Sequence, residues 1–136
     1  MFRGKRTDNG KWVEGWYCQK KTGHYEGDRF VEEIQPIIIA SMTGGGYQYA
    51  VVDLKTVCQY TGYTDLRQKK VFEHDAVFCE DGGYCGHIVF KEGCFLIEWE
   101  EARTDLRGDI HFWFENRRMY VTSNIFDNPE LVGNNA

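Results

Sequence analysis

The stretch CQYTGYTDLRQKKVFEHDAV, residues 58–77, gathers acidic, basic, imidazole and thiol side chains in one short segment. Glu73 and Asp75 are two residues apart, so on a strand both carboxylates would point the same way, roughly 7 Å apart. That spacing suits paired acid–base chemistry. Alternatively, a carboxylate that accepts N–H bonds from the loop 59–66 would lock that loop. We interpret the stretch as a structural junction between two β lobes.

Within this junction, Gln59-Tyr-Thr-Gly62 is predicted to be a tight turn, because Gly62 tolerates a positive φ and Tyr60 can pack beneath it. Residues 67–70 are predicted to be a solvated loop that precedes re-entry into the core. The predicted junction residues are Gln59, Tyr60, Gly62, Asp65, Phe72, Glu73 and Asp75.

Outward from the junction, alternation of apolar and polar residues predicts short strands separated by turns. Asp8-Asn-Gly10 is a hairpin-turn signal, so residues 2–19 are predicted to form a hairpin. The polar residues 20–27 are predicted to be a loop. Further strands are predicted at 30–41, 47–52, 74–80, 86–90 and 94–100.

The aromatic stretch near the C-terminus is predicted to be a strand, residues 110–114, in a hairpin with 118–121. This pattern places Ile110, Phe112 and Phe114 toward the core, with His111 and Trp113 on the opposite face. The strand 118–121 is predicted to be an exposed edge, which invites pairing between subunits. Asn128 and Pro129 predict the start of a helix, with at most one helical turn before Gly133.

The fold class predicted from these strands is mainly β, with two small interlocked lobes and at most short helical turns. The lobes span about 1–57 and 73–136, with a linker at about 58–72. The turns around residues 75–77, 86–88 and 95–97 resemble those of SH3-like barrels, so the C-terminal lobe is predicted to be a small SH3-like barrel. A chain of 136 residues can bury roughly two thirds of its unfolded surface, so it needs neither metal nor disulfides to fold.

Composition limits the compartment and the class of partner. The formal net charge is -5, which argues against non-specific binding to nucleic acid or membranes. Residues 1–6 lead into polar sequence with no apolar segment, so we expect no signal peptide, and no apolar run has the length of a membrane span. Five cysteines without a CxxC spacing suit reduced thiols, which predicts a cytoplasmic protein.

No catalytic residue, metal site or cofactor site is predicted. Cys79, Cys85, His87 and Cys94 include preferred zinc ligands, but structural zinc sites usually rest on a CxxC pair, which this chain lacks. Neither HExxH nor Gly-x-Ser-x-Gly occurs. The glycines at 44–46 lack the Lys-Ser/Thr and the helix of a phosphate-binding loop.

The first 21 residues carry a net charge of +4 within this acidic chain. A basic ribbon could face a phosphate backbone, which gives an alternative reading as a nucleic-acid-binding barrel. Its candidate contacts are Arg3, Lys5, Arg6 and Lys11. Residues 73–101 argue against it, because they hold eight acidic residues and one lysine.

Three segments together resemble the YopX-like proteins of phages and prophages. They are FRGKRTDNGKWVEG at 2–15, the junction with Gln59-Tyr-Thr-Gly62, Asp65 and Phe72-Glu73-x-Asp75-x-Val77, and NIFDNPEL at 124–131. The chain departs from the family where the family usually has glycine, at Cys58, Gln68, His74 and Ser123. The resemblance implies a largely β fold and a phage-derived context, and it implies no catalytic residue.

These observations predict a non-enzymatic phage or prophage accessory protein that acts by binding protein or by self-association, as a homo-oligomer or with a phage or host protein partner. The nucleic-acid-binding barrel is one alternative. An enzyme using Glu73, Asp75 or a cysteine is the other, and it would require that group to lie in a concave pocket.

Overall fold

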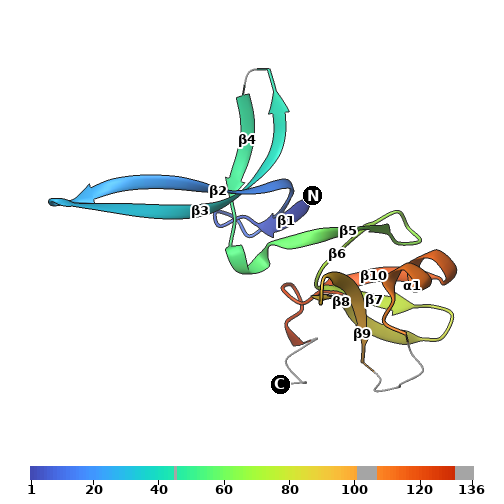
Figure 1. Ribbon diagram of the computed structural model, residues 1–136. Coiled ribbons are helices and arrows are strands. Elements are labelled where there is room, and N and C mark those ends of the chain that lie inside the picture. The colour runs from blue at the N-terminus through green and yellow to red at the C-terminus, as the bar shows by residue number, and fades with distance from the viewer. Residues whose placement is uncertain (45, 101–106, 131–136) are drawn as a thin grey trace. The chain divides into compact units, whose positions relative to one another are not determined.

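The computed structural model describes residues 1–44, 46–100 and 107–130 (Figure 1). The chain divides into two compact units, Met1–Gln59 and Tyr60–Ala136. The fold is mainly β, as predicted, and the strand pairs of the described residues are antiparallel. No helix within the described ranges has the length and apolar character to cross a bilayer.

The first unit is a sheet with the strand order β4-β3-β2-β1-β5. Its elements are β1 (Phe2–Lys5), β2 (Trp12–Glu26), β3 (Arg29–Thr43), β4 (Gly46–Val51), a 3-10 turn (Leu54–Thr56) and the start of β5 (Cys58–Thr64). Its buried apolar residues are Ile37, Ile38, Ala50, Val52 and Cys58. The predicted first hairpin is confirmed, since Lys5 pairs with Trp12 and Gly10 takes a φ of 71° in the turn.

The predicted loop at 20–27 is wrong, because β2 continues to Glu26 and pairs with β3 over this whole length. The register runs from Trp16 opposite Ile39 to Glu26 opposite Arg29, and Gly27 reverses the chain at a φ of 64°. A ribbon with solvent on both faces needs no apolar alternation, so its sequence resembles a loop.

The first unit carries two hairpins that project in different directions (Figure 1). The register of β3 against β4 shifts between Ile39 and Ser41, which marks a bulge. Because a bulge bends its strand, β3 leaves the β2–β3 ribbon and continues into the hairpin with β4. The outer part of the β2–β3 ribbon therefore has no third strand beside it among the described residues.

The second unit contains the end of β5 and a four-stranded sheet with the order β10-β7-β8-β9. Its other elements are β6 (Lys70–Phe72), β7 (Asp75–Cys79), β8 (Tyr84–Lys91), β9 (Cys94–Trp99), α1 (Ile110–Asn116) and β10 (Met119–Asn124). Its core consists of Val71, Val77, Cys79, Ile88, Ile97, Ile110, Trp113, Met119 and Val121. The sheet is open in the described residues, so the SH3-like barrel stays a prediction.

The predicted strand at 110–114 is wrong, because these residues form the helix α1. Asp109 caps its N-terminus by accepting a hydrogen bond from the N–H of His111 at 3.0 Å. Ile110 and Trp113 are buried together, as helical spacing allows. Trp113 thus lies in the core instead of on an opposite face. The helical turn predicted before Gly133 extends outside the described residues.

The tight turn predicted at Gln59–Gly62 is also wrong, because β5 runs through it. Between the pairs Tyr60–Phe72 and Thr64–Lys70, β5 advances four residues while β6 advances two, so β5 carries a bulge. Gly62 takes the predicted positive φ, 90°, and lies within this bulge. The left-handed backbone therefore bends a strand here instead of reversing the chain.

Gln68 and His74, two of the positions at which the sequence departs from the resemblance noted above, have φ values of 67° and 71°. Side chains with a Cβ are strained in this region. Gln68→Gly should therefore raise the free energy of unfolding by about 1 kcal/mol. Urea denaturation followed by tryptophan fluorescence measures this. The control is Lys69→Gly, where added backbone freedom should lower stability by roughly 0.5–1 kcal/mol. A loss of stability in Gln68→Gly would contradict the strain.

Candidate functional site

Asp65 is a buried carboxylate of the junction with three backbone partners. It is 3% exposed. Its Oδ1 accepts the backbone N–H groups of Arg67 and Lys69, each at 2.9 Å, and its Oδ2 accepts the N–H of Val121 at 2.9 Å. By accepting three N–H bonds, this buried carboxylate holds the loop 65–69 in shape and fixes it to Val121. We call this arrangement the Asp65 clasp.

The Asp65 clasp covers the outer edge of β10. Beside the bond to Val121 N–H, the N–H of Leu66 donates to the carbonyl of Met119 at 3.0 Å. The Arg67 Nη2 donates to the carbonyl of Val121 at 3.1 Å. The predicted exposed edge at 118–121 is therefore wrong, because the loop after β5 occupies its hydrogen-bonding groups. A covered edge does not template pairing with another chain.

Glu73 and Asp75 do not form the predicted same-face pair. His74 lies between them at a φ of 71° and turns the chain from β6 into β7. Asp75 is fully buried, and its Oδ2 accepts the N–H of Phe72 at 2.8 Å. Glu73 is partly exposed and lies 3.5 Å from the His74 Nε2. Asp75 thus bonds to the backbone of Phe72 in the interior, whereas Glu73 lies partly in solvent beside the His74 ring.

The other predicted junction residues lie along β5 and β6. Gln59 is exposed and pairs with Phe2 of β1. Tyr60 lies opposite the buried Phe72, with ring centroids 5.5 Å apart. Gly62 is in the bulge.

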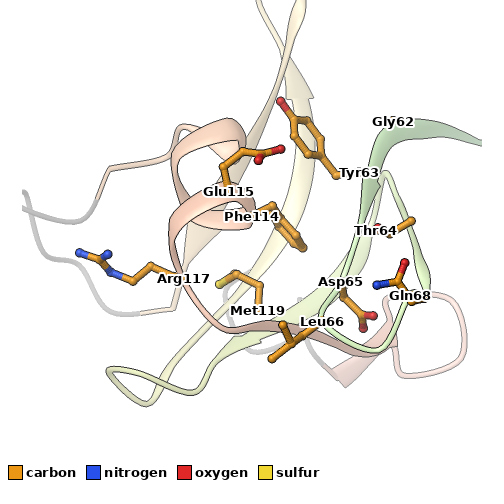
Figure 2. Close-up of a pocket in the computed structure, with 10 residues that line it drawn as sticks. All are labelled: Gly62, Tyr63, Thr64, Asp65, Leu66, Gln68, Phe114, Glu115, Arg117 and Met119. Carbon is orange, nitrogen blue, oxygen red and sulfur yellow. The ribbon is translucent and has the colours of Figure 1, made fainter.

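A polar pocket of about 320 Å³ lies beside the Asp65 clasp (Figure 2). It is lined by Gly62, Tyr63, Thr64, Asp65, Leu66, Gln68, Phe114, Glu115, Arg117 and Met119. Asp65 is its buried carboxylate, and three N–H groups occupy its oxygens, so it is poorly placed to act as a general base. Tyr63 donates or accepts one hydrogen bond with His111 Nδ1 at 2.9 Å. The pocket can therefore hydrogen-bond a ligand, but its buried carboxylate is not available for paired acid–base catalysis.

The thiols considered for zinc are dispersed. Cys79 lies in the core, whereas Cys85 and Cys94 are exposed. His87 Nε2 lies 3.4 Å from Glu98 Oε2. A hydrogen bond from Lys91, with a smaller contribution from His87, lowers the pKa of Glu98. In the described part of the chain, no three metal-ligating side chains come together.

Three of the four candidate phosphate contacts of the N-terminal ribbon contact other side chains of the first unit. The guanidinium of Arg3, which is buried, lies 4.5 Å from the ring centroid of Trp12, and the Lys5 ammonium lies 5.4 Å from it. Arg6 donates two hydrogen bonds to Asp8, which lowers the pKa of that carboxyl. Lys11 is exposed. This arrangement does not present the four bases as one phosphate-facing row.

We call the outer β2–β3 ribbon, residues 19–36, the arm. Among the large apolar side chains of the described residues, the most exposed one lies on this arm. Tyr25, Phe30 and Ile34 are 72%, 51% and 55% exposed. Tyr25 and Phe30 are register partners next to the tip, with ring centroids 5.2 Å apart. The Phe30 ring lies over Gly23, where a Cβ would come within 2.2 Å of it.

All three apolar side chains lie on one face of the arm. Side chains alternate along each strand, and the register places Tyr25 with Phe30 and Lys21 with Ile34 on the same side. We call this side the apolar face. The opposite face is polar: His24 Nε2 lies 3.3 Å from Glu26 Oε1, and its Nδ1 lies 4.0 Å from Glu33 Oε1.

The arm was not anticipated as a functional surface. Its signal in the sequence is Tyr25-Glu-Gly-Asp-Arg-Phe30, in which aromatic residues flank a Gly-containing turn. Interpreting Gly27-Asp28 as a hairpin turn would have paired Tyr25 with Phe30 and revealed the ribbon.

The family description "YopX protein" matches residues 1–133 of the chain. The chain belongs to the YopX protein family. The family therefore covers both units of this YopX chain, together with the arm and the Asp65 clasp. The structure is similar to that of protein EF1440 from Enterococcus faecalis, with 18% sequence identity, 96% of each chain covered and a TM-score of 0.49. Among curated proteins, none matches the sequence.

The Asp65 clasp predicts a large stability effect in this YopX protein. Asp65→Ala leaves three backbone N–H groups without their acceptor, so the free energy of unfolding should fall by about 3 kcal/mol or more. Urea denaturation measures the loss. Glu115→Ala, which removes an exposed carboxylate of the same pocket, is the control and should change stability by less than about 0.5 kcal/mol. Equal effects of the two substitutions would contradict the clasp.

Proposed function

We propose that this YopX-family protein is a non-enzymatic phage or prophage accessory protein that acts by binding protein through the apolar face of its arm. The observation that carries the proposal is the set of Tyr25, Phe30 and Ile34, exposed together on one face of a two-stranded ribbon. An exposed apolar cluster of this kind marks an interaction surface. We further propose a cytoplasmic location, which suits five cysteines that stand as thiols.

The energetics favour a partner on the apolar face. Fully burying a side chain of this size contributes about 1.5–3 kcal/mol. An isolated two-stranded hairpin is marginally stable in water, so docking would both bury the rings and order the ribbon. The Tyr25–Phe30 pair is already packed edge to face, which reduces the entropy lost when it binds.

The enzyme alternative has less support. It needs a reactive group in a concave pocket, and in the pocket of Figure 2 the buried carboxylate already accepts three backbone N–H bonds. The nucleic-acid alternative needs a displayed basic row. Two of its four bases lie over the Trp12 ring, and a third is paired with Asp8.

The double variant Tyr25→Ser/Phe30→Ser should lose binding while it keeps its fold, because both side chains are exposed. Aromatic anchors contribute about 2 kcal/mol or more each at interfaces, so affinity should fall at least a hundredfold. The measurement is recovery of bound protein, further copies of the chain included, on the immobilised protein in a bacterial lysate. Circular dichroism checks the fold.

Val31→Ser, on the other face of the arm, is the matched control and should retain whatever the wild type binds. Loss of one protein in the double variant alone supports the proposal. An identical set of recovered proteins in the wild type and the double variant would show that the arm is not the binding element.

A further inference from the structure

We propose that the partner of the apolar face is the apolar face of a second copy of this chain, in a two-fold symmetric dimer. The inference rests on the proposed function and names the occupant of the surface. It predicts that the protein is a dimer built arm against arm.

The apolar face carries charges of both signs. Lys21 lies on β2 and Glu32 on β3, in adjacent rows of the register, with Lys21 opposite Ile34 and Glu32 opposite Gly23. Both side chains point to the side that bears Tyr25 and Phe30. A surface with its own acid and its own base is complementary to itself under a two-fold axis, which is the condition for an isologous interface.

The strands of the arm fix how two copies would meet. In the dimer, the apolar faces of the two copies lie against each other. A two-fold axis parallel to the strands, midway between these two apolar faces, places β2 of one copy over β3 of the other. This arrangement puts each Lys21 close to Glu32 of the partner subunit. It also stacks the Tyr25–Phe30 row of one copy on the same row of the other. The Tyr25–Phe30 pairs of both copies then form one aromatic cluster. Charge and apolar contacts thus favour the same arrangement.

The size of the arm sets the expected affinity. The arm holds eight residue pairs, from Gln19–Pro36 to Glu26–Arg29. At about 3.4 Å per residue its face is roughly 27 Å long. Such a face gives an interface at the small end of the range for specific association, so we expect a dissociation constant in the micromolar range.

The other surfaces discussed above suit self-pairing less well. The outer edge of β10 is covered by the Asp65 clasp. On the polar face of the arm, the ring of His24 already lies beside two carboxylates, those of Glu26 and Glu33. Of these three surfaces, the apolar face is the one on which exposed large apolar side chains and charges of both signs lie together.

Charge reversal across the interface tests the inference. Lys21→Glu makes both charges of the face negative, and Glu32→Lys makes both positive. Each variant alone should dimerise at least tenfold more weakly than the wild type, because like charges then face each other. An equimolar mixture should recover association, since a negative face meets a positive one. Sedimentation velocity between about 1 and 100 µM measures the mass against the 15.9 kDa of one chain.

Lys20→Glu and Glu33→Lys are the controls. Lys20 is next to Lys21 in the sequence, and Glu33 is next to Glu32. Each control changes the net charge by the same amount as the matching test variant, but its side chain points to the polar face of the arm. They should dimerise like the wild type, singly and mixed. Recovery in the Lys21→Glu and Glu32→Lys mixture alone supports the inference.

Wild-type protein that stays monomeric throughout this range overturns the inference, as does a mixture that recovers nothing. If Tyr25→Ser/Phe30→Ser still abolishes capture of a different protein, the proposed function stands with another occupant. If the double variant also binds everything that the wild type binds, the proposed function fails as well.

Discussion

The hydrogen bond from the Val121 N–H to the Asp65 carboxylate is the contact on which the second unit depends most. It fastens the loop after β5 along β10, and the same carboxylate holds that loop in shape through the N–H groups of Arg67 and Lys69. A buried carboxylate is stable only when its oxygens are well satisfied, so the loop and the strand edge must form together. The second unit thereby closes a strand edge that would otherwise attract other chains.

The arm of the first unit, unlike the edge of β10, is left uncovered by the described residues. No third strand of the described residues lies beside its outer ribbon, and its apolar face exposes Tyr25, Phe30 and Ile34. The same chain covers one sheet edge and leaves an apolar ribbon exposed. We therefore propose the arm as the interaction surface, and we assign a structural role to the polar cluster of residues 58–77.

The sequence predicts secondary structure well where one face of a strand is buried, and poorly where distant contacts or solvent on both faces decide the conformation. The mainly β fold and the first hairpin follow from alternation and from Asp8-Asn-Gly10. Gly62 was expected at positive φ, but whether that bends a strand or reverses it depends on the distant partner Phe72. Residues 110–114 alternate like a strand, yet the Asp109 cap and the joint burial of Ile110 and Trp113 select a helix. The arm escaped prediction because a ribbon with solvent on both faces leaves no periodic apolar signal.

The contrast between a closed edge and an open arm is the central claim, and residue-resolved hydrogen exchange at two protein concentrations tests it most directly. The amide of Val121 should be strongly protected and independent of concentration, because its acceptor belongs to the same chain. Amides of the arm should exchange fast in dilute protein and slow down as concentration rises. Fast exchange at the Val121 amide would contradict the account. So would exchange rates of the arm amides that do not change with protein concentration when no other partner is present.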